Sequence, residues 1–100
     1  MKFLTGKFMK YNYIYSMKNI TMYSGPMCAF CDAAKRLLKR NSLDYKVIDV
    51  SSGPEVRDEM IKKANGKRTI PQIFFNDEHI GGYQELRELE KAGNLISSLK

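Results

Sequence analysis

The spacing of apolar residues alternates between two periods along residues 19–100, and this alternation constrains the fold more than any other feature. Runs rich in β-branched and aromatic residues predict four strands, at 19–24, 44–50, 70–75 and 79–82. Apolar residues spaced three and four apart predict helices after residue 27, over 52–64 and from about residue 83. The order β-α-β-α-β-β-α predicts an α/β fold, in which helices cover a sheet that begins with a parallel βαβ unit.

Both ends of the second helix carry local signals. Ser52 and Glu55 have the spacing of a capping box, and Pro54 suits a first helical turn, so we expect this helix to begin at Ser52. The pair Asn65-Gly66 is expected to end it, because these residues readily adopt the left-handed conformation that terminates helices.

Residues 1–18 differ in composition from the rest of the chain. They hold four of the 17 basic residues, none of the 11 acidic ones and five aromatic residues. Lysines and Gly6 interrupt the apolar stretch that a secretory signal requires, and no run approaches the roughly 18 apolar residues of a membrane span. We therefore expect residues 1–18 to be an N-terminal extension outside the fold, residues 19–100 to form one domain, and the protein to be cytoplasmic with no membrane span.

The net charge of +6 is concentrated in that extension. No basic stripe with interleaved aromatic residues follows it, so we expect no nucleic-acid partner.

Both cysteines of the chain, Cys28 and Cys31, fall where the first strand passes through a Gly-Pro loop into the first helix. Residues three apart on a helix are neighbours whose Cα separation permits a disulfide. Cys28 is expected at the helix N-terminus, where unpaired N–H groups and the helix dipole stabilise a thiolate. Cys31 shares an apolar stripe with Ala34 and Leu38 and should be shielded. We therefore expect Cys28 to exchange with the substrate and Cys31 to resolve the mixed disulfide.

Other interpretations of the pair stay open at this point. A structural zinc site generally needs four ligands, and the chain adds only His79, for which a solvated or structural role is the simpler explanation. A structural disulfide would close a very small loop and add little stability. Two buried cysteines could share a helix face by chance. A redox pair is favoured, because a C-x-x-C at a strand–loop–helix junction of a cytosolic protein is typically catalytic.

Three segments, in this order and spacing, resemble those of small bacterial dithiol glutaredoxins: MYSGPMCAFCDAAKRLL, NGKRTIPQIFFND and HIGGYQEL. The resemblance covers roughly residues 19–100. It implies a thioredoxin fold with a four-stranded mixed sheet. It also implies a glutathione-dependent thiol-disulfide oxidoreductase that acts on glutathionylated or disulfide-bonded proteins, and we expect a monomer.

The resemblance also implies roles for individual residues. Cys28 and Cys31 would be catalytic, with Cys28 carrying the mixed disulfide with glutathione, and Ile70-Pro71 would be a cis peptide. Glutathione would be bound by Phe30, Thr69, Ile70, Pro71, Gly82, Tyr83 and Gln84.

Several positions depart from the family pattern. The usual Cys-Pro-Tyr-Cys is Cys-Ala-Phe-Cys here, so Ala29 and Phe30 replace a proline and a tyrosine. Gly25 stands where many members have a lysine that contacts glutathione. Gln84 stands where an acidic residue is common, so contact with the γ-glutamyl amino group should be weakened or remade.

Three alternative functions remain. Without the proline at position 29, a [2Fe–2S] cluster could bridge two copies, held by Cys28 of each and by two glutathione thiolates. A glutaredoxin-like electron donor recycled by thioredoxin reductase fits the same cysteine pair. Thioredoxin itself is disfavoured, because the chain has no Trp and Met27 precedes the first cysteine. A non-catalytic binding domain is least favoured, because both cysteines are present.

Overall fold

The sheet has the strand order β2-β1-β3-β4 in the computed structural model, which describes residues 17–100. β1 pairs parallel with β2 and antiparallel with β3, and β3 pairs antiparallel with β4. The strands are β1 (Ile20–Ser24), β2 (Lys46–Asp49), β3 (Gln72–Phe75) and β4 (Glu78–Gly81). The predicted class, the four-stranded mixed sheet and the parallel βαβ start are confirmed.

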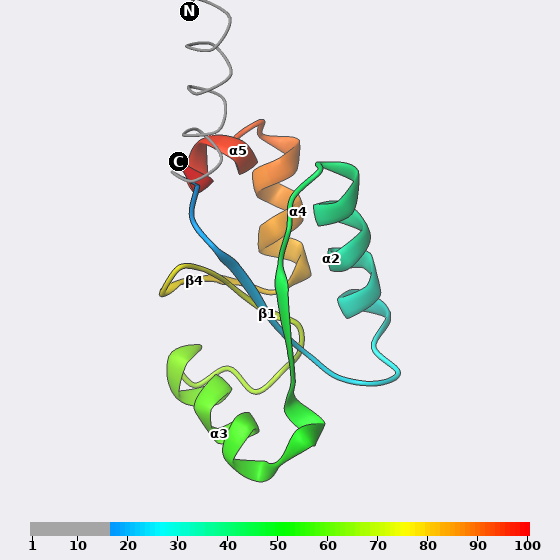
Figure 1. Ribbon diagram of the computed structural model, residues 1–100, viewed down its shortest axis with the longest axis vertical. Coiled ribbons are helices and arrows are strands. Elements are labelled where there is room, and N and C mark those ends of the chain that lie inside the picture. Colours follow the sequence, from blue (N-terminus) through cyan, green and yellow to red (C-terminus); the bar gives the residue numbers. More distant parts are fainter. Residues whose placement is uncertain (1–16) are drawn as a thin grey trace, which may run out of the picture.

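Helices cover both faces of this sheet (Figure 1). α2 and α4 lie side by side on one face with α5 beyond them, and α3 lies on the other face. The helices are α2 (Ala29–Arg40), α3 (Pro54–Lys63), α4 (Tyr83–Lys91) and α5 (Leu95–Leu99), and a 3₁₀ turn, η1 (Val50–Ser52), precedes α3. This is the predicted thioredoxin fold.

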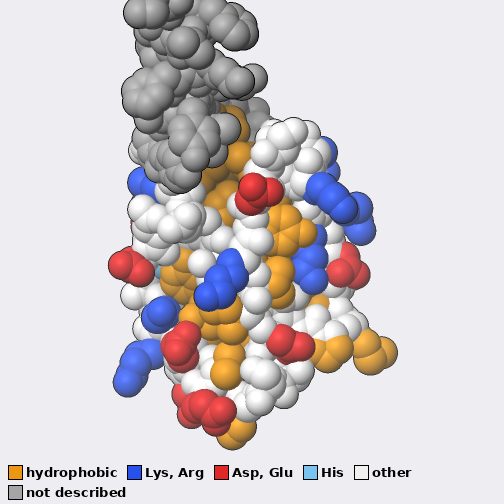
Figure 2. Space-filling view, viewed as in Figure 1, with side chains coloured by type: hydrophobic (Ala, Val, Ile, Leu, Met, Phe, Trp, Pro, Cys, Tyr) orange, Lys and Arg blue, Asp and Glu red, His pale blue; other side chains and the backbone are white. Residues whose placement is uncertain are grey.

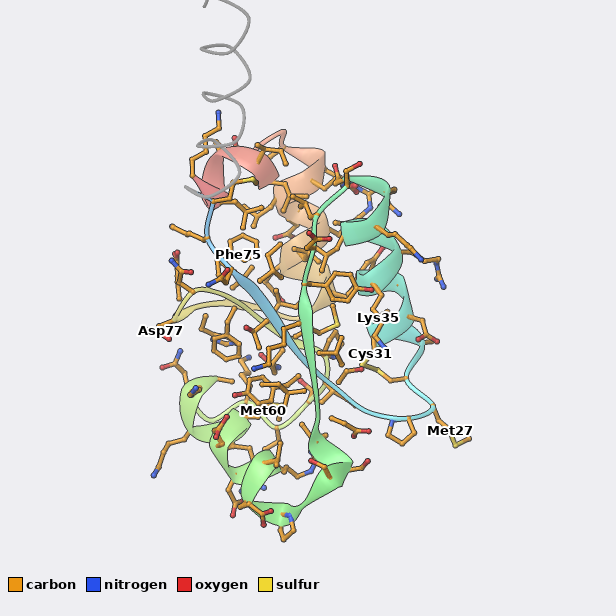
Figure 3. The ribbon with its side chains drawn as sticks, viewed as in Figure 1. Met27, Cys31, Lys35, Met60, Phe75 and Asp77 are labelled. Carbon is orange, nitrogen blue, oxygen red and sulfur yellow. A yellow bond between two sulfur atoms is a disulfide. The ribbon has the colours of Figure 1, made fainter. Side chains whose placement is uncertain are left out.

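The two-residue period of the strands explains the two layers. Alternate side chains of β1 and β3 point to opposite faces of the sheet. Those facing α2, α4 and α5 are Ile20, Met22, Ile73 and Phe75. Those facing α3 are Tyr23 and Phe74, which pack with Met60 and Ala64 of that helix and its C-cap. Burial of a side chain as large as Met60 or Phe75 (both labelled in Figure 3) contributes roughly 1.5–3 kcal/mol to folding.

The start of α3 corrects one prediction. The N-cap of α3 is Gly53, without a side-chain capping bond, so the capping box of Ser52 and Glu55 was wrong. Asp49 explains the difference: its carboxylate accepts from the Ser51 N–H at 2.8 Å, and its carbonyl accepts from the Ser52 hydroxyl at 2.6 Å. These bonds form the 3₁₀ turn and occupy the serine that was expected to cap the helix.

The other end of α3 follows the prediction. The N–H of Gly66 donates to the carbonyl of Ile61 at 2.9 Å, and Asn65 and Gly66 have φ angles of 57° and 90°. Both residues therefore adopt the left-handed conformation that ends a helix.

The predicted extension falls mostly outside the described residues, so its role stays a prediction. Met17 packs against the core formed with α2, α4 and α5. The N–H of Lys18 donates to the carbonyl of Leu99 at 2.7 Å. Met17 and Lys18, the last two residues of the predicted extension, therefore contact the domain. Among residues 17–100, no helix is both long enough and apolar enough to cross a membrane.

Glu90 joins α4 to the end of α2. The Arg40 guanidinium donates twice to its carboxylate, from Nε at 2.9 Å and from Nη2 at 2.7 Å, and Asn41 Nδ2 donates at 2.7 Å. These bonds, chiefly the one from Arg40, lower the pKa of Glu90 to about 2. The ion pair links two helices that both contribute to the site described next.

Candidate active site

Cys28 is the N-cap of α2. Its backbone is extended, with φ −123° and ψ 102°, and its sulfur accepts a hydrogen bond from the N–H of Cys31 at 3.1 Å. The carbonyl of Cys28 accepts the N–H of Asp32 at 3.1 Å, so the helix begins directly after the cysteine. The sulfur therefore lies against the unpaired N–H groups and the positive end of the helix dipole, which stabilise an anion.

The two cysteines form a disulfide, and their Cα atoms are 5.2 Å apart (Figure 3). This separation lies within the ordinary range for disulfides. Their environments differ, because Cys28 is partly exposed whereas Cys31 is 1% exposed. The structure thus makes one sulfur accessible to a partner and encloses the other, which is the asymmetry that the sequence predicts.

Exposed apolar side chains flank the cysteine pair. Met27 is fully exposed at the tip of the loop and points away from the body of the protein (Figure 3), and Phe30 is 64% exposed. Met27 also has a φ of 54°, which is an uncommon conformation for any residue other than glycine. Basic side chains line the edge of the molecule formed by α2 (Figure 2).

The loop before β3 faces the cysteines. The peptide bond Ile70-Pro71 is cis, as the resemblance implies. The carbonyl oxygen of Ile70 lies 3.7 Å from the sulfur of Cys28. Pro71 directly precedes β3, which begins at Gln72 rather than at residue 70. The fold therefore places the backbone of this loop beside a sulfur that is about forty residues away in sequence.

A groove of about 730 Å³ is bounded by this loop, by the first turn of α2 and by α4. Such a volume lies within the range of small-molecule sites. All seven residues predicted to bind glutathione line it: Phe30, Thr69, Ile70, Pro71, Gly82, Tyr83 and Gln84. The rings of Phe30 and Tyr83 are stacked, with centroids 6.0 Å apart and planes inclined by 23°. The structure brings these residues onto one surface, and their binding role stays a prediction.

Sequence analysis missed four further residues that line the groove: Glu85, Arg87, Glu88 and Lys91. Two of them follow Tyr83 at intervals of four, so a helical stripe beginning at Tyr83 was the signal that could have found them.

Glu85 occupies one of the backbone donors at the N-terminus of α4. Its carboxylate accepts the N–H of Gly82 at 2.7 Å, so that donor is already satisfied. The N–H groups of Tyr83 and Gln84 lie in the first helical turn, where no intrahelical acceptor is available. These two groups can donate hydrogen bonds to the carboxylate of a ligand at the positive end of the helix dipole.

The described part of one copy of the chain does not assemble the ligand set of a metal site. Among residues 17–100, no group of three or more His, Cys, Asp or Glu side chains is placed to hold a metal ion. The chain has only two cysteines, and they are bonded to each other, so a single copy does not fit a [2Fe–2S] cluster with its four thiolate ligands. The cluster shared by two copies stays a prediction.

Comparison with known proteins agrees with this geometry. A family model, Glutaredoxin, matches residues 20–80. A glutaredoxin from Pseudomonas aeruginosa is 39% identical over 83 residues, which cover 83% of this chain and 98% of that protein.

Solved structures give the same result. The glutaredoxin of Brucella melitensis superposes with a TM-score of 0.75 at 42% identity, covering 85% of this chain and 91% of that one. A buckwheat glutaredoxin–glutathione complex shares the fold, with a TM-score of 0.74 at 22% identity over 91% of this chain and 84% of that one. With its cysteine pair at the start of α2 and a cis proline facing it, this protein belongs to the glutaredoxin family of thiol-disulfide oxidoreductases.

Proposed function

We propose that the protein uses glutathione to reduce mixed disulfides between glutathione and proteins, and also disulfides within proteins. One observation carries the proposal: the accessible sulfur of Cys28 lies beside a groove lined by every residue that the family resemblance assigns to glutathione. The buckwheat relative with the same fold was solved as a glutathione complex, which supports the assignment. A cytoplasm rich in reduced glutathione would supply the electron donor.

The monothiol half of the cycle needs only Cys28. Its thiolate attacks the glutathione sulfur of a glutathionylated protein, so a Cys28–glutathione bond forms and the glutathione–protein bond breaks. The protein thiolate leaves and takes a proton from water. A second glutathione thiolate then attacks the bound glutathione sulfur, which releases glutathione disulfide and regenerates the Cys28 thiolate.

The dithiol half of the cycle adds Cys31. When Cys28 attacks a protein disulfide, the protein becomes attached to Cys28 through one of its sulfurs. The Cys31 thiolate then attacks the Cys28 sulfur, which closes the internal disulfide and releases the reduced protein. Because Cys31 is buried and its N–H already contacts the Cys28 sulfur, its accessible target is Cys28. Two glutathione molecules then reduce the internal disulfide.

The groove can contribute binding energy at both ends of glutathione. The Ile70 backbone lies beside the Cys28 sulfur, where it can pair with the cysteinyl part of the ligand. The N–H groups of Tyr83 and Gln84 can donate hydrogen bonds to the γ-glutamyl carboxylate. Holding both ends aligns the glutathione sulfur with Cys28, and such alignment lowers the barrier to attack.

A turnover assay with two electron sources tests the proposal. The substrate is a glutathionylated peptide, and the sources are glutathione with glutathione reductase, or thioredoxin reductase alone. We expect turnover with the first source and none above background with the second. Turnover supported only by thioredoxin reductase would instead identify the alternative electron donor. Cys28→Ser, which should be inactive with both sources, provides the blank.

A further inference from the structure

Gln72 is a buried polar residue, 3% exposed, directly after the cis proline. Its side-chain Nε2 donates to the Thr69 carbonyl at 3.0 Å and to the Thr69 hydroxyl at 3.2 Å. Its Oε1 lies 2.6 Å from Nε2 of His79 on β4. One side chain therefore connects the interior of the sheet to the loop that lines the groove.

These partners determine where the proton of His79 resides. Because the Gln72 amide nitrogen faces Thr69, its oxygen faces His79, and a carbonyl oxygen can only accept. His79 Nε2 therefore carries the hydrogen and donates it. The other ring nitrogen, Nδ1, lies 3.3 Å from the Asn65 amide nitrogen and accepts from it. The neutral imidazole thus uses both of its nitrogens.

The surroundings of His79 favour this neutral form. The ring packs against Phe74, with centroids 5.1 Å apart. Burial lowers the pKa of His79, and the charge of Lys67 lowers it further, while the charge of Glu85 acts in the opposite direction. A donor at Nε2 is present in the neutral tautomer and also in the imidazolium, so the bond to Gln72 does not depend on the charge of the ring.

We propose that His79 and Gln72 are positioning residues, which hold Thr69 through a chain of hydrogen bonds and thereby fix the Thr69–Pro71 backbone against Cys28. The proposal rests on the proposed function, in which this backbone binds glutathione. The loop needs such support because residues 65–69 are all exposed and pack little apolar surface. Gln72 gives the loop a buried anchor next to the site.

Two variants interrupt this chain of hydrogen bonds at different residues. Gln72→Met keeps the length of the side chain and loses both sets of hydrogen bonds. His79→Phe keeps a ring against Phe74 and loses the donor. For each, we expect KM for a glutathionylated peptide to rise about tenfold and kcat to stay within about twofold, because ground state and transition state lose the same contact with the loop. The double variant should have the same KM as the single variant with the higher KM, because the two residues act in series and the second substitution removes nothing further.

Rescue and control variants separate positioning from general destabilisation. His79→Gln supplies another N–H donor toward Gln72 and should keep KM within about threefold of the wild type. Asn65→Gly removes the second partner of His79, preserves the positive φ at that position and should leave KM unchanged.

The outcomes are distinguishable. Wild-type KM in folded Gln72→Met and His79→Phe proteins would overturn the positioning role. Absence of glutathione-dependent turnover in the wild type would overturn the proposed function instead. In that case, ¹⁵N NMR of the wild-type imidazole decides the hydrogen-bond chain: a protonated, slowly exchanging Nε2 supports it, and an unprotonated Nε2 contradicts it. That spectrum also decides the matter if Gln72→Met does not fold.

Discussion

The N–H of Cys31 donates to the sulfur of Cys28, and the same residue keeps its own sulfur buried beneath the start of α2. The backbone N–H of Cys31 thus stabilises the sulfur of Cys28, and the Cys31 thiolate can attack the same sulfur once Cys28 carries a mixed disulfide. The two roles are separable, because a substitution of the Cys31 side chain leaves the backbone donor in place.

We expect Cys28→Ser to reduce turnover of a glutathionylated peptide to background, because Cys31, the other cysteine of the chain, is buried. Cys31→Ser should retain turnover within about tenfold of the wild type, since glutathione can resolve the mixed disulfide. Its reduction of a protein disulfide should fall much further, because release of the protein needs Cys31. Steady-state rates on both substrates check this, and equal loss for both variants on the glutathionylated peptide would contradict it.

The next prediction concerns Gly25, which stands where many members of the family have a lysine. A Cβ atom at position 25 would lie 2.9 Å from Cδ1 of Ile70, the mobile end of a side chain, and 3.6 Å from Val50. The site can therefore accept a side chain after a small shift of Ile70. We expect Gly25→Lys to lower KM for a glutathionylated peptide by about threefold at low salt, because an ammonium group beside the groove attracts anionic glutathione.

Gly25→Met is the matched control, because it has similar length and no charge. It should not lower KM. The gain in Gly25→Lys should disappear as salt is raised toward 1 M, where screening acts within about 3 Å. A gain that is equal in both variants or independent of salt would show that charge is not its cause.

Glu90→Gln should destabilise the protein in a pH-dependent way. The pKa of Glu90 is about 2 in the folded protein and about 4.3 in an unfolded chain. A carboxyl whose folded pKa is depressed contributes stability above its unfolded pKa, and this contribution is lost as pH falls from about 4.5 to about 2. Because the side chain is 19% exposed, we expect a loss of about 1–3 kcal/mol at pH 7.

Urea denaturation at several pH values measures this loss. The difference between wild type and Glu90→Gln should be large at pH 7 and small near pH 2.5. Glu88→Gln, an exposed substitution on the same helix, should change stability by less than about 0.5 kcal/mol at either pH. A Glu90→Gln effect of the same size at both pH values would rule out the ionised carboxylate as its source.

Deleting residues 1–16 should leave the melting temperature within about 3 °C and turnover within about twofold, because the predicted regular elements begin only near Asn19 and residues 1–16 lack their apolar periodicity. A second deletion that also removes Met17 and Lys18 loses a core contact and the bond to Leu99. It should lower the melting temperature further. A large loss from the shorter deletion would show that residues 1–16 belong to the domain.

The types and spacing of neighbouring residues in the sequence were enough to predict much of the fold and of the candidate site. The change of apolar period from two to 3.6 around the Gly-Pro loop was enough to place Cys28 at the start of a helix and Cys31 on its buried side, because both depend on residues within one or two turns. The motif resemblance named the seven residues that line the groove and the cis proline. The Ser52 capping box failed although it too is local, because Asp49 offered that serine a competing bond.

The tertiary structure decided the relationships between segments that lie far apart in the chain. Packing of the loop before β3 against the start of α2 brings the Ile70 carbonyl to the Cys28 sulfur. The same packing turns Gln72 and His79 into support for that loop, and it pairs Arg40 with Glu90 across two helices. The Cys28–Ile70 and Arg40–Glu90 pairs are separated by 42 and 50 residues, whereas Gln72 is three residues from Thr69 and seven from His79. Apolar periodicity specifies which face of an element is buried. It does not specify which polar groups meet once those faces have packed, because that depends on the three-dimensional arrangement of the whole sheet and its helices.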